Sequence, residues 1–108
     1  MWVFTSRSFV SIVEHADEPS LLHVRARFPG DIEELFPRAD VIETPNADYR
    51  YRTSLPREKV AEALTRALKA IDYTSFKGTV EDPERKDAYI QVWEAMWRAQ
   101  DRQNSDWG

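Results

Sequence analysis

The stretch YRYRTSLPREKVAEALTRALKAI (residues 49–71) contains an alternating segment followed by an amphipathic one. Side chains of a strand point alternately to its two sides, so residues 49–55 predict a strand with one core face and one basic face. Pro56 suits the first turn of a helix, where its missing N–H is no loss. The core face of the strand is Tyr49, Tyr51, Thr53 and Leu55, the basic face is Arg50, Arg52 and Ser54, and the apolar stripe of the helix is Val60, Ala63, Leu64, Ala67, Leu68 and Ile71.

Two further segments predict a hairpin before this unit. Residues 9–14 (FVSIVE) are rich in β-branched and apolar residues at both odd and even positions, which favours a strand covered on both sides. Residues 22–28 alternate again, with Leu22 and Val24 on one parity and His23 and Arg25 on the other. The polar turn at 15–20 joins the two strands, giving a hairpin from residue 9 to residue 28. Residues 2–4 are apolar but short, and fit a strand start or an edge contact.

Helix signals complete the order of elements. Asp31 is placed as the N-cap of a short helix over 32–36, with Glu34 completing a capping box. Residues 41–44 read as a strand that forms a second hairpin with 49–55. Asp82, Pro83 and Glu84 begin the last helix. The prediction is an α+β fold, ordered β-β-α-β-β-α-α, with a four-stranded, mostly antiparallel sheet carrying two long helices on one face. It forms one domain over 1–98, followed by a polar, frayed tail over 99–108.

Bulk properties restrict the classes of function. The chain has 108 residues, a formal net charge of −4 and no cysteine. An acidic chain disfavours non-specific binding to nucleic acid or membranes by the whole molecule, and the missing thiols exclude disulfides and Cys-based zinc sites. The start of the chain lacks the pattern of a signal peptide, and no apolar run is long enough for a membrane helix. We therefore expect a soluble cytoplasmic protein without a cofactor.

The candidate binding residues are the basic residues at alternate positions of the two predicted hairpins. If the alternate residues meet the helices, four arginines and one histidine share the opposite sheet face. Guanidinium groups pair with carboxylates and phosphates in bidentate geometry, so this face predicts an anionic partner. The alternative is an ordinary solvated face whose arginines pair across strands with Glu14, Glu43 or each other's neighbours. The candidates on this face are His23, Arg25, Arg27, Arg50 and Arg52.

The last helix supplies a second candidate surface. Tyr89, Val92, Trp93 and Met96 form its apolar stripe, and Trp97 lies beside that stripe. Tryptophan and methionine are favoured in protein interfaces, so Trp97 is a candidate contact for a protein partner or for self-association. The opposite interpretation is that this stripe packs in the core.

Catalytic and metal-binding patterns are weak. His15 lies in a polar turn and His23 has no Ser or Asp at a motif spacing, so we assign no catalytic residue and no metal ligand. The leading hypothesis is a non-enzymatic binding module, a small adaptor or inhibitor that binds a protein. The alternatives are nucleic-acid or nucleotide binding through the same arginines, and a small hydrolase or metal-dependent enzyme that uses His15 or His23.

Three runs carry a resemblance: GDIEELFP, ADYRYRTSLPREKVAEAL and IDYTSFKGTV…RKDAYIQVWEAM. Over about residues 9–96 the chain resembles a type of short bacterial and phage-associated protein with no assigned activity. The resemblance implies a compact single domain of bacterial or phage origin. It carries over no functional residue, because it contains no chemical motif.

Overall fold

The computed structural model describes residues 1–107, with side chains through residue 104. The chain divides into two compact units, the first over Met1–Asp72 and the second from Tyr73 onward, and each is described by itself. The first contains β1 (Trp2–Phe4), β2 (Phe9–Glu14), β3 (Leu21–Ala26), α1 (Asp31–Leu35), β4 (Ile42–Glu43), β5 (Tyr51–Pro56) and α2 (Arg57–Lys69). The second contains the 3-10 helix η1 (Lys77–Thr79) and α3 (Pro83–Trp107).

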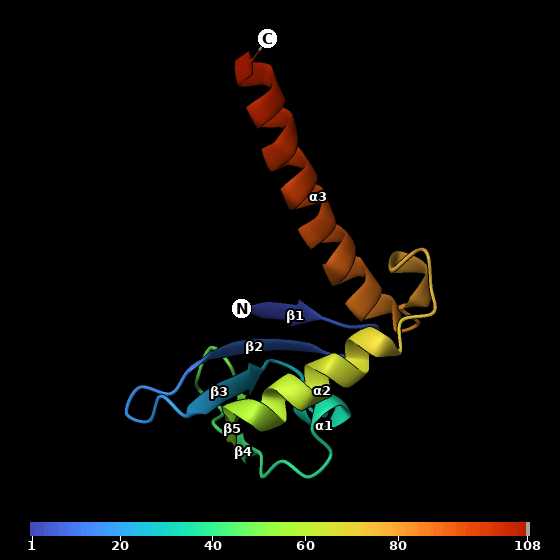
Figure 1. The fold of residues 1–108 in the computed structure, drawn as a ribbon. Coiled ribbons are helices and arrows are strands. Elements are labelled where there is room, and N and C mark those ends of the chain that lie inside the picture. Colours follow the sequence, from blue (N-terminus) through green and yellow to red (C-terminus); the bar gives the residue numbers. More distant parts are fainter. Residues whose placement is uncertain (108) are drawn as a thin grey trace. The chain divides into compact units, whose positions relative to one another are not determined.

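The sheet has five antiparallel strands in the order β1-β2-β3-β5-β4 (Figure 1). Both predicted hairpins are confirmed, as β2–β3 and β4–β5. The prediction of four strands was wrong because β1 also pairs, with Val3 opposite Val10. The Met1 ammonium group donates to the Ile12 carbonyl oxygen at 2.9 Å, which extends this short edge pairing. Three residues are too few to show a period, so only the pairing identifies the strand.

Helices α1 and α2 cover one face of this sheet. Val10 lies opposite Ala26, and Ile12 lies opposite Val24, so these four side chains point to the same side. Burial of such aliphatic side chains is the main favourable contribution to folding. The core consists of these four with Ile32 and Phe36 from the α1 segment and Val60 and Ala63 from α2.

The start of α1 differs from the prediction. Asp31 is the first helical residue, and Gly30 is the N-cap, with a positive φ of 88° that glycine adopts without strain. No side chain caps this helix. The buried Asp31 carboxylate instead accepts a hydrogen bond from the Phe9 backbone N–H at 2.9 Å. Asp31 therefore ties α1 to the start of β2.

The predicted α2 stripe is buried only in its first half. Val60 and Ala63 are buried, whereas Leu68 and Ile71 are exposed. Pro56 ends β5 and serves as the N-cap of α2, one position before the first helical turn. The short α1 shares the sheet face with α2. Helix α3 belongs to the second unit, so the packing of the last helix on the sheet stays a prediction.

In the second unit the predicted helix start is confirmed. The Asp82 carboxylate accepts a hydrogen bond from the Arg85 backbone N–H at 2.8 Å. The rings of Phe76 and Tyr89 stack with centroids 5.8 Å apart, and Val80 and Tyr89 are buried. Within the part of the chain that the structure describes, no helix is both long and apolar enough to cross a membrane.

Candidate functional site

The sheet face opposite the core carries most of the predicted binding residues. Along it, Arg25 lies opposite Ser11 on one side and opposite Arg52 on the other, while His23 lies opposite Val13 and Ser54. Val24 between them points into the core, so the alternation of β3 separates the two faces. We call this surface the arginine face and define it as Ser11, His23, Arg25, Arg27, Tyr49, Arg52 and Ser54.

Tyr49 lies on the arginine face, whereas the sequence pattern placed it in the core with Tyr51. Strand β5 begins at Tyr51, and residues 47–49 form a bend before it, so the alternation does not extend back to Tyr49. The Tyr49 ring is buried beneath two guanidinium groups, with its centroid 4.5 Å from Cζ of Arg25 and 4.2 Å from Cζ of Arg27. Such cation–π contacts hold both arginines against the sheet.

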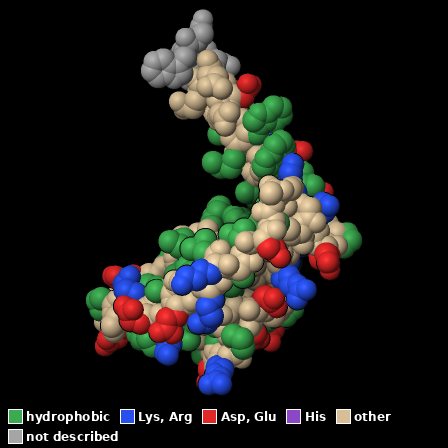
Figure 2. Space-filling view, turned by 45° about the vertical axis from the view of Figure 1, so that its right-hand side comes forward, with side chains coloured by type: hydrophobic (Ala, Val, Ile, Leu, Met, Phe, Trp, Pro, Cys, Tyr) green, Lys and Arg blue, Asp and Glu red, His purple; other side chains and the backbone are tan. Residues whose placement is uncertain are grey.

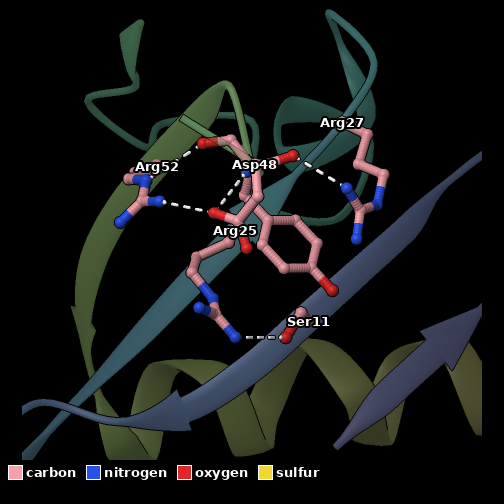
Figure 3. Close-up of polar contacts among 6 residues, drawn as sticks. Ser11, Arg25, Arg27, Asp48 and Arg52 are labelled. Atoms are coloured by element: carbon pink, nitrogen blue, oxygen red, sulfur yellow. Dashed lines mark hydrogen bonds and ion pairs between the residues drawn. The ribbon is translucent and has the colours of Figure 1, made fainter. Parts of the chain in front are cut away.

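Asp48 is the polar centre of this cluster (Figure 3). The Arg52 Nη2 group donates to Asp48 Oδ1 at 3.1 Å, and Arg52 Nε donates to the Tyr49 carbonyl oxygen at 3.0 Å. Arg27 Nη1 donates to the Asp48 carbonyl oxygen at 2.8 Å. Arg52 of β5 and Arg27, which follows the end of β3, therefore hold the bend at 48–49.

Arg25 has no carboxylate partner among the described residues. Its Nη2 donates to Ser11 Oγ at 2.8 Å, and its buried Nε has no hydrogen-bond partner in the described part of the chain. It also lies directly opposite Arg52, and like charges on opposed strand positions are destabilising. Of the three guanidinium groups here, only that of Arg52 pairs with a carboxylate, that of Asp48, among the described residues, which makes the arginine face cationic on an acidic protein.

The charge of this face acts on His23. Burial lowers the pKa of His23 below its ordinary value of 6.5, and the positive charges of Arg52 and Arg25 lower it further. Its Nδ1 lies 3.4 Å from Ser54 Oγ, and its ring lies 6.2 Å from that of His15. Because a neutral imidazole is favoured, the arginines supply the positive charge of this face near neutral pH.

Two predicted residues lie elsewhere. Arg50 forms an exposed ion pair with Glu43 at 2.7 Å, and this hydrogen bond, together with the charge of Glu43, raises the pKa of Arg50. Trp97 belongs to the second unit, where its ring stacks on that of Trp93. The structure therefore brings together His23, Arg25, Arg27 and Arg52.

Sequence analysis missed an aromatic strip on the same side of the sheet. Phe4 lies opposite Phe9, and their rings stack with centroids 4.4 Å apart. Trp2 lies opposite Ser11, contacts Phe9 edge-on at 6.0 Å and is 64% exposed. The aromatic residues at positions 2, 4 and 9 indicate this strip only if β1 pairs with β2, and the sequence pattern does not show that pairing.

His15 has a local structural role. Its Nδ1 accepts hydrogen bonds from the backbone N–H groups of Asp17 and Glu18, each at 3.2 Å, and so closes the β2–β3 turn. Within the described residues, no group of three or more His, Asp or Glu side chains is placed to hold a metal ion. Comparisons of the chain with protein-family models, curated proteins and solved structures find no match.

Proposed function

We propose that this protein is a non-enzymatic binding module whose arginine face binds an acidic segment of a partner protein. The observation that carries the proposal is the excess of guanidinium groups on that face. Among the described residues, Arg52 pairs with the Asp48 carboxylate, whereas Arg27 donates to the Asp48 backbone carbonyl and Arg25 to the Ser11 hydroxyl. A carboxylate of the partner would offset the repulsion between Arg25 and Arg52, which lie on opposed positions of β3 and β5.

The contacts around Tyr49 favour binding because they order the cationic groups in advance. Arg25 and Arg27 lie against the same buried ring, and Arg52 is fixed by the bend at 48–49. Long side chains that are already ordered lose less conformational entropy when a partner binds. The exposed ring of Trp2 adds an aromatic contact on the same side of the sheet, a residue type that is frequent among binding hot spots.

Fluorescence anisotropy with a labelled Glu-rich peptide tests this proposal. Arg27 is exposed on the arginine face, and Arg38 is an exposed arginine in the α1–β4 loop. Arg27→Gln and Arg38→Gln change the net charge equally, so they form a matched pair. We expect Arg27→Gln to weaken binding by about three- to tenfold and Arg38→Gln to leave it within about twofold, as for the loss of one charged contact. Equal affinities of the two variants would exclude the arginine face as the binding surface.

Binding of single-stranded nucleic acid is the second candidate, and the exposed Trp2 is the observation that favours it. Bases stack on exposed aromatic rings, and nearby arginines contact phosphates. In the same assay, a labelled oligothymidine would bind with an affinity that falls steeply as salt rises, and Trp2→Ala would reduce that affinity. Tighter binding of the peptide than of an oligonucleotide of equal charge would support the protein partner.

A further inference from the structure

Helix α3 carries an apolar surface that the proposed function does not use. Trp93, Met96 and Trp97 follow one another at helical spacing and are 49%, 67% and 58% exposed. Together with Ala99, Gln100 and Gln103 they line a groove of about 590 Å³. Figure 2 shows hydrophobic side chains gathered along the middle of this helix. Exposed apolar surface concentrated in this way is typical of interaction sites.

The aromatic part of this surface is ordered within its own unit. The Trp93 and Trp97 rings stack with centroids 5.8 Å apart. The ammonium group of Lys77, in η1, lies 4.1 Å from the centroid of the Trp93 ring. These contacts fix the two rings and place one positive charge beside the Trp93 end of the groove.

The chemistry of the groove suits a copy of itself. Among its described lining residues are no charged side chains, and two glutamines border the apolar centre. An amide both donates and accepts hydrogen bonds, so the glutamines of one copy can pair with the same glutamines of a second copy. Elsewhere on the helix, Arg98 pairs with Glu94 at 4.0 Å, and Asp87 accepts a hydrogen bond from Gln91 at 2.9 Å. No like charge would therefore oppose like charge at the centre of a symmetric contact.

We propose that this groove binds the same groove of a second copy, with the two α3 helices antiparallel and crossing at Trp97. In a two-fold contact, residue i of one copy meets residue j of the other and the reverse. Crossing at Trp97 sets position 93 opposite position 101. Trp93, Trp97 and Asp101 are four residues apart and lie along one side of the helix. Trp93 of one copy therefore lies opposite Asp101 of the other. Lys77, which lies beside Trp93, then faces this Asp101.

This charge complementarity selects the antiparallel arrangement. It occurs twice in the dimer, once at each end of the contact, because of the two-fold symmetry. A parallel pair would instead set Lys77 near Lys77 and Asp101 near Asp101. The groove has six described lining residues, fewer than the roughly 20–30 residues that each side of a standard interface contributes, so we expect a weak dimer.

Sedimentation velocity of the full chain over a concentration series tests the proposal. We expect the mean mass to rise from 12.6 kDa towards twice that value as the concentration approaches about 1 mM. Trp97→Ala should raise the dissociation constant at least about tenfold, as for an interface hot spot. The matched control is Gln91→Ala, which alters a side chain paired with Asp87 on the same helix and should leave dissociation unchanged. Wild-type protein that stays monomeric, or a Trp97→Ala variant that associates like the wild type, would overturn the proposal.

A charge exchange tests the antiparallel arrangement. Lys77→Glu and Asp101→Lys should each weaken the dimer severalfold, and the double variant should dimerise more tightly than either single variant. A double variant that is weaker than both would contradict the crossing at Trp97. Far-ultraviolet circular dichroism of each variant distinguishes loss of the contact from loss of the helix. None of these substitutions touches the arginine face, so the result is independent of the proposed function.

Discussion

The two faces of the sheet are built by the same strands, yet they differ in what they contribute. On the helix face Val24 is fully buried with Ile12 opposite it, whereas on the arginine face the neighbouring pair is Val13, 38% exposed, opposite His23. One face concentrates apolar contacts, which stabilise the fold. The other concentrates arginines around a single carboxylate, at some cost in repulsion. A face that is less stable than it could be is typical of a binding surface.

The largest expected effect tests the stability of the helix face directly. Val24→Ala removes methyl groups from a fully buried site and should lower the free energy of unfolding by about 2–3 kcal/mol. Val13→Ala makes the same chemical change one strand away on the arginine face, and should cost less than about 1 kcal/mol. Because both variants lose the same strand propensity, their difference measures burial. Urea denaturation of both proteins provides the values, and equal losses would contradict the distinction between the faces.

Substitutions of Tyr49 should have a smaller effect, and they test whether the aromatic contacts of the arginine face stabilise the fold. Tyr49→Leu removes the ring beneath Arg25 and Arg27 but keeps an apolar side chain, and should cost about 1–2 kcal/mol. Tyr49→Phe keeps the ring and should stay within about 0.5 kcal/mol of the wild type. Thermal and urea denaturation measure both. If the leucine variant is as stable as the phenylalanine variant, the stacking of the guanidinium groups does not stabilise the bend.

Local pattern predicted the faces well where the strands are regular. The alternation of residues 22–26 and 51–55 correctly assigned Val24 and Thr53 to the core, and Arg25 and Arg52 to the other face. It failed for Tyr49, because the strand starts two residues later and a bend reverses the side on which this ring lies. Alternation predicts sidedness only within a strand, and the pattern itself does not show where the strand begins.

The other errors came from contacts between distant residues. Asp31 has the spacing of an N-cap, but its carboxylate accepts a hydrogen bond from Phe9, 22 positions earlier in the chain. Arg50 alternates in step with Arg52 but pairs with Glu43 on the neighbouring strand, as the alternative interpretation of this face predicted. Neither partner lies within the local window on which caps and alternation are judged. The aromatic strip on β1 and β2 was missed for the same reason, since its residues meet only through strand pairing.

The smallest expected effect is on the pH dependence of stability, and it tests the electrostatic environment of His23 on the arginine face. Burial and the charges of Arg52 and Arg25 lower the pKa of His23 in the folded protein, so the unfolded chain takes up this proton more readily. As the pH falls through 6.5, the unfolded state gains a proton that the folded state resists, and stability decreases.

His23→Gln removes this contribution, so the stability of the variant should fall less between pH 7 and pH 5 than that of the wild type. Urea denaturation across that range measures the difference. His15→Gln should keep most of this fall, because the charge of His15 lowers the pKa of His23 less than burial and the charges of Arg52 and Arg25 do. If His23→Gln and the wild type lose stability in parallel, burial and the charges of Arg52 and Arg25 do not disfavour the protonated form of His23 in the folded protein.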